Sequence, residues 1–98
     1  MEINYEDLKT KRLTASGIVI DHAAWLYSII GNSYADSSSL IYIRNGQDTS
    51  GNIILDLSGS QFGSDIIVFN CPVYFNRGIY AEFSTAGYSV FAQFILEY

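Results

Sequence analysis

The chain changes direction twice within Phe69-Asn70-Cys71-Pro72-Val73-Tyr74-Phe75-Asn76-Arg77-Gly78-Ile79-Tyr80. An apolar run ends at the only proline, restarts, and is interrupted again at Arg77-Gly78 before a third run begins. Proline cannot donate a ladder hydrogen bond, so Pro72 belongs at a strand start, an edge or a bulge. The stretch therefore predicts a corner where strands pass between two packed sheets.

Short apolar or alternating segments flank this corner on both sides. They predict a bent strand over 9–20 and strands over 24–30, 40–44, 52–57, 65–69, 78–84 and 88–98. A helix over 24–30 is the competing interpretation, but Gly31-Asn32 follows too soon for one of normal length. The sequence predicts an all-β fold, an antiparallel sandwich of about eight short strands that is jelly-roll-like, with an immunoglobulin-like sandwich as the alternative.

Period-2 alternation assigns faces to several of these strands. Trp25, Tyr27 and Ile29 are expected on one face of their strand, and Ile53, Leu55 and Leu57 on one face of theirs. The last strand has the clearest pattern, in which one face is formed by Tyr88, Val90, Ala92, Phe94, Leu96 and Tyr98.

The composition has too little charge for a small isolated domain. The 98 residues fit one domain, which we divide into an N-terminal arm over 1–8 and a single β-sandwich over 9–98. Only 15% of the residues are charged, against about 25% in typical globular domains. Because a small domain has much surface to cover, we expect another chain to cover part of it.

Several strands carry apolar residues on both faces, which indicates self-association. The residues expected on the outward faces are Ile43, Ile54, Phe91 and Ile95. In water they would form a patch of a kind that monomers rarely show. We predict a homo-oligomer, with a trimer favoured. The alternative is that loops or strand bending cover these residues within one chain.

The net charge of −5 argues against nucleic acid as a partner. Three of the five cations cluster at Lys9–Arg12, where they either contact an anion locally or form a solvated lead-in. Ile3 and Tyr5, together with Lys11 and Arg12, are candidates for attachment to another protein, unless this terminus is frayed. No apolar run approaches ~18 residues and no secretion signal opens the chain, so neither a membrane nor the secretory route is expected.

The sequence predicts no catalytic, metal or cofactor site. Cys71 is expected to be a buried, inert thiol, because the only histidine, His22, lies in a distant segment. Asp48, Asn52 and Asp56 lack the calcium-loop spacing, and ordinary loop capping explains them. The aromatic residues could form a glycan-stacking platform or fill a core or interface. Those considered are Trp25, Tyr27, Tyr42, Tyr74 and Tyr80, of which Trp25, Tyr27 and Tyr42 are the platform candidates.

The span from Lys9-Thr10-Lys11-Arg12-Leu13-Thr14-Ala15-Ser16-Gly17 to the Phe69–Tyr80 stretch resembles small virion proteins of tailed bacteriophages. The shared order is a basic lead-in, a Ser-Gly strand, a corner and a Gly-Ile-Tyr strand. The resemblance implies a non-enzymatic protein of the virion, made in the host cytoplasm, that decorates a capsid or serves a fibre base or tail. It implies a capsid or tail protein as partner and supplies no catalytic residue. The alternatives are a carbohydrate-binding module for host glycans and an acidic protein inhibitor.

Overall fold

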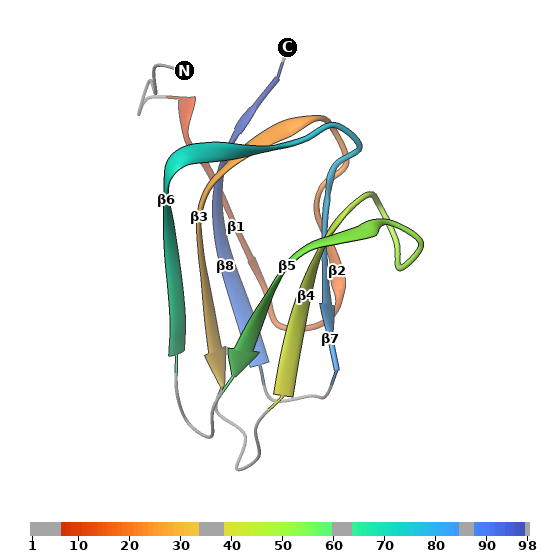
Figure 1. The fold of residues 1–98 in the computed structure, drawn as a ribbon, viewed down its shortest axis with the longest axis vertical. Helices are drawn as coiled ribbons and strands as arrows, with labels where there is room; N and C mark the ends of the chain where they lie inside the picture. The colour runs from red at the N-terminus through yellow and green to blue at the C-terminus, as the bar shows by residue number, and fades with distance from the viewer. Residues whose placement is uncertain (1–6, 34–38, 60–63, 85–87, 98) are drawn as a thin grey trace.

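The computed structural model describes residues 7–33, 39–59, 64–84 and 88–97, and they form two antiparallel β-sheets that pack face to face (Figure 1). One sheet has the strand order β1-β8-β3-β6 and the other β2-β7-β4-β5. The strands are β1 (Lys9–Leu13), β2 (Gly17–Ile20), β3 (Ala24–Ser33), β4 (Ser39–Asn45), β5 (Asn52–Gly59), β6 (Ser64–Phe75), β7 (Ile79–Phe83) and β8 (Tyr88–Leu96). The prediction of an antiparallel sandwich of about eight strands is confirmed.

The order of the strands is that of a jelly roll. β1 pairs with β8, β2 with β7, β3 with β6 and β4 with β5, as in one long hairpin of eight strands. This hairpin is rolled up so that β8 also pairs with β3 and β7 with β4. In an immunoglobulin fold the first two strands share a sheet, whereas here β1 and β2 lie in different sheets. The immunoglobulin-like alternative is therefore wrong.

The first apolar segment is two strands and not one bent strand. The chain leaves β1 at Leu13, crosses between the sheets at Thr14–Ser16 and enters β2 at Gly17. The hydroxyl of Ser16 accepts a 2.8 Å hydrogen bond from the backbone N–H of Phe83, which fixes the crossing against β7. The small residues that precede Gly17 lie at this crossing.

The chain passes between the sheets at the second turn of the predicted corner, Arg77-Gly78, and not at its first turn, Pro72. β6 continues through Pro72 to Phe75 in the same sheet, and Phe69–Pro72 form an irregularity opposite Tyr27 of β3. Pro72 thus occupies a bulge in an edge strand, as its missing N–H requires. The chain crosses to the other sheet at 76–78, where Gly78 has a φ of 107° and a Cβ would lie 2.7 Å from the carbonyl oxygen of Ile20.

The core lies between the two sheets and is continuous among the described residues. Its largest fully buried hydrophobic side chains are Tyr88, Phe75, Leu26, Ile29, Ile41, Ile43, Leu57, Ile79 and Val90. The predicted inward face of β8 is confirmed from Tyr88 to Phe94, and Leu96 packs against the core; Tyr98 lies outside the described residues. In β3, a bulge between Leu26 and Ser28 turns Ile29 into the core, so its predicted place beside Trp25 is wrong.

Candidate self-association surface

Most of the exposed large hydrophobic residues that the structure describes lie on two edge strands. The described large hydrophobic residues that are exposed are Ile18, Ile53, Ile54, Val68 and Tyr74. Four of these five lie on β5 and β6, which are edge strands of the two different sheets and contact each other. We call Ile53, Ile54, Val68 and Tyr74 the β5–β6 side.

A bulge in β5 exposes two consecutive isoleucines. Ile43 pairs with Leu55 and Arg44 pairs with Ile53, so Ile54 is the extra residue. The irregularity removes Ile53 from the inward face that Leu55 and Leu57 share. The predicted face of Ile53 is therefore wrong, whereas Ile54 is exposed, as a self-association residue must be.

The other predicted self-association residues are less accessible. Ile43 has an exposed fraction of 0% because it faces the core beside Ile41, so it cannot lie on an association surface. Ile95 is 9% exposed and Phe91 is half-buried. Both lie on the outer face of β8, whose two neighbours in the sheet are β1 and β3. Within one chain Ile95 is thus buried and Phe91 partly buried, without any need for a second copy to cover them.

The residues predicted for glycan stacking are dispersed, and only two of the four residues predicted for attachment are described. Lys11 and Arg12 are exposed on β1, and Ile3 and Tyr5 lie outside the described residues. Trp25 and Tyr42 lie in different sheets, so the predicted set with Tyr27 does not form one platform.

The aromatic partner of Trp25 is Tyr74 of β6. The ring centroids are 4.7 Å apart and the planes are tilted by 38°. A hydrogen bond to the Glu97 carboxylate, with smaller contributions from burial and from the Glu97 charge, raises the pKa of the Tyr74 hydroxyl. Pairing of Ala24 with both Phe75 and Leu96 brings the ends of β6 and β8 to the start of β3, which explains this cluster. Tyr74 was among the aromatic residues considered from the sequence, but its pairing with Trp25 could not be predicted because it depends on the register of β3 and β6.

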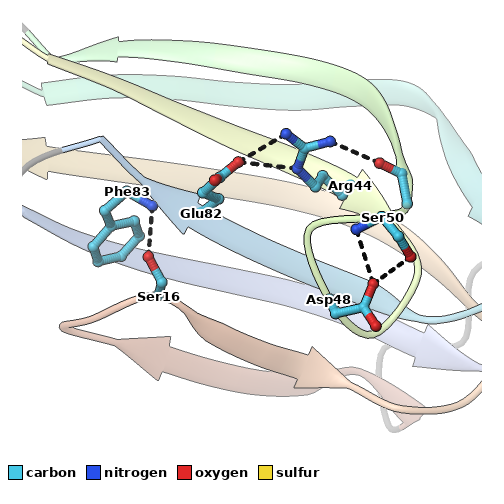
Figure 2. A network of polar contacts seen from close by, with 7 residues as sticks. Ser16, Arg44, Asp48, Ser50, Glu82 and Phe83 are labelled. Atoms are coloured by element: carbon cyan, nitrogen blue, oxygen red, sulfur yellow. Dashed lines mark hydrogen bonds and ion pairs between the residues drawn. The ribbon is translucent and has the colours of Figure 1, made fainter.

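The outer face of the other sheet carries a polar network (Figure 2). Arg44 of β4 donates two hydrogen bonds to one carboxylate oxygen of Glu82 in β7, at 3.0 and 2.8 Å, and a third to the carbonyl of Gly51 at 2.8 Å. Arg44 thereby fastens the loop between β4 and β5 to the sheet. The guanidinium also lies 6.0 Å from the ring centre of Tyr42.

A polar cavity of about 380 Å³ lies beside this loop and is lined by Gly46, Gln47, Asp48, Ser50, Gly51 and Arg77. Asp48 accepts hydrogen bonds from the hydroxyl and the N–H of Ser50, and these bonds lower the pKa of its carboxyl (Figure 2). The carboxylate is engaged within its own loop, which is the loop capping expected from the sequence.

The side chains of Cys71 and His22, which could take part in chemistry, are both exposed. Cys71 is exposed because it falls in the irregular part of an edge strand, so the prediction of a buried thiol is wrong. His22 is exposed, and its Nε2 lies 3.4 Å from the carboxylate of the neighbouring Asp21. Within the described ranges, no group of three or more potential metal ligands occurs. The same ranges contain no helix that could cross a membrane.

The fold and its surface thus define an eight-stranded jelly-roll domain with an apolar side. No protein-family model, curated protein or solved structure matches the chain.

Proposed function

We propose that this protein is a non-enzymatic structural subunit that self-associates and forms part of a bacteriophage virion, where it decorates or stabilises a capsid or appendage. The resemblance of the Lys9–Gly17 and Phe69–Tyr80 segments to small virion proteins motivates the phage assignment. The observation that carries self-association is the concentration of four exposed large hydrophobic residues on the β5–β6 side. Such a surface favours a partner that is also apolar.

The oligomeric mass tests the self-association part of this proposal. Sedimentation equilibrium over a range of protein concentrations is expected to give a homo-oligomer, and the trimer favoured from the sequence stays a prediction. A monomer at every concentration would refute self-association. For the virion part, the chain is expected to co-purify with intact particles, and its absence from purified particles would contradict that assignment.

A host-glycan-binding module is the second candidate, and the Trp25–Tyr74 pair favours it. Aromatic rings exposed on a sandwich surface can stack on sugars, and Tyr74 is exposed beside the half-buried Trp25. Titration with glycans would then quench the fluorescence of Trp25, the only tryptophan, in a saturable way. Tyr74→Ala would weaken this response and Tyr42→Ala, on the other sheet, would not. A glycan array without binding would exclude this candidate.

A further inference from the structure

The two sheets have four edge strands, and three of them carry features that discourage pairing with another strand. β1 carries the cations Lys9, Lys11 and Arg12, β2 has only four residues, and β5 is interrupted by the bulge at Ile54. Charge, shortness and bulges are the devices with which natural proteins block edge-to-edge association. β6 differs, because it is 12 residues long and its only charged residue is Asp65.

Only the first half of β6 is suited to pairing. The irregularity over Phe69–Pro72 and the missing N–H of Pro72 interrupt the second half. Between Ser64 and Val68 the strand pairs regularly with β3, residue by residue from Asn32 to Ser28. Among the described strands, β6 has no neighbour on its other edge. Val68, in this half, is the most exposed of the described large hydrophobic residues at 62%.

We propose that this half of β6 pairs in antiparallel orientation with the same segment of a second copy, about a two-fold axis near Ile67. The two four-stranded sheets then join into one continuous sheet of eight strands, β1-β8-β3-β6 followed by the same order reversed. This inference rests on the proposed self-association and specifies its surface, and it requires a dimer in place of the trimer predicted from the sequence. A row of backbone N–H and C=O groups at a sheet edge selects an extended strand as its partner.

The segment is complementary to itself, which points to a second copy as the occupant. About an axis at Ile67, position 66 of one copy is paired with position 68 of the other, so that an isoleucine position is opposite a valine position. The two Asp65 positions are four residues apart along the strands, or about 13 Å at ~3.3 Å per residue. That separation exceeds the Debye length of about 8 Å at physiological ionic strength, so repulsion between them is weak. A two-fold interface uses the same patch on both copies.

The test compares two lysine substitutions at exposed apolar positions. Val68→Lys places two ammonium groups at diagonal positions across the proposed axis and removes apolar contact between the copies. We expect sedimentation equilibrium to give a dimer whose dissociation constant rises at least tenfold in Val68→Lys. Ile18→Lys on β2, an edge strand of the other sheet, is the matched control and should leave the constant unchanged. Circular dichroism checks that both variants are folded.

Hydrogen exchange of the unmodified protein gives a second measurement. Amides within 64–69 should become more protected as the protein concentration rises through the dissociation constant, whereas those of β2 should not change. A trimer, a dimer that Val68→Lys leaves intact, or exchange in 64–69 that is independent of concentration would overturn β6 pairing while leaving self-association in place. A monomer would overturn both proposals.

Discussion

Replacing Arg44 with methionine tests whether the ion pair with Glu82 stabilises the fold or makes no contribution to its stability. Methionine keeps most of the apolar stem and removes the charge together with three hydrogen bonds, two to Glu82 and one to Gly51. The side chains of Arg44 and Glu82 are 18% and 29% exposed, so the pair is neither fully buried nor freely solvated. Exposed pairs contribute about 0–1 kcal/mol, and breaking a buried pair costs about 3–5 kcal/mol.

The intermediate exposure of this pair sets the expected magnitude between these limits. Loss of hydrogen bonds to a charged group costs about 1.5–3 kcal/mol, so we expect Arg44→Met to lower the free energy of unfolding by about 2 kcal/mol. For a domain of this size that corresponds to a fall in Tm of about 8–16 °C. Urea denaturation followed by circular dichroism measures the first quantity, and a thermal scan the second.

A double-mutant cycle with Glu82→Gln separates the pair from other effects of the substitution. The two changes should be non-additive by about 1 kcal/mol or more, because each removes the same contact. Arg77→Met, at an exposed arginine outside the strands, is the control and should change stability by less than about 0.5 kcal/mol. If Arg44→Met behaved like this control, or if the cycle were additive, the ion pair would contribute nothing to the fold and our reasoning would be wrong.

Three further substitutions test the crossing between β6 and β7, the core, and the loop between β4 and β5 that Asp48 caps. Gly78→Ala should lower the free energy of unfolding by at least about 2 kcal/mol in urea denaturation, because φ is 107° and a Cβ would lie 2.7 Å from the Ile20 carbonyl oxygen; an unchanged midpoint would contradict this. Ile43→Ala should lower the free energy of unfolding by about 2–5 kcal/mol as a core truncation and leave the oligomeric state of the folded protein unchanged. A loss of assembly without destabilisation would show instead that Ile43 lies on the association surface. Asp48→Ala should destabilise the protein at neutral pH but not in acid. The pKa of the Asp48 carboxyl in the folded protein lies below the ordinary 3.8. The stability that the charged carboxylate contributes is therefore fully present above pH 3.8 and is lost as the pH falls through the folded pKa. An equal deficit in Asp48→Ala at both pH values, measured by urea midpoints, would rule out the ionised capping interaction with Ser50.

The strand segments and the sandwich could be predicted because they depend on local alternation. β8 keeps an uninterrupted period of two from Tyr88 to Phe94, and its buried face was predictable residue by residue. The faces of β3 and β5 were not, because a bulge adds one residue and moves all later side chains to the other face. Nothing in the local pattern near Tyr27 or Ile54 distinguishes such a bulge from a regular strand.

The exposed apolar surface was harder to predict because exposure depends on the position of a strand within its sheet. Phe91 and Ile54 both lie outside the core, yet Phe91 belongs to a strand with a neighbour on each side and Ile54 to an edge strand. An apolar side chain on an outward face is therefore shielded in a central strand and exposed in an edge strand. Strand order arises from long-range pairing, such as β1 with β8, which period-2 reasoning does not address.

The low charge content now has a more specific explanation than a general need for a partner. Some apolar residues on outward faces, such as Ile95, are buried within the chain. Most of the large hydrophobic residues that are exposed lie on the two edge strands β5 and β6. An exposed apolar surface spread over all eight strands would favour association in many orientations, whereas one limited to two edge strands favours a few. The features that discourage strand pairing at β1, β2 and β5 leave β6 as the edge strand best suited to pair with a second copy. The arrangement of edges, and not the total apolar area, is therefore what can give this small domain a defined geometry of assembly.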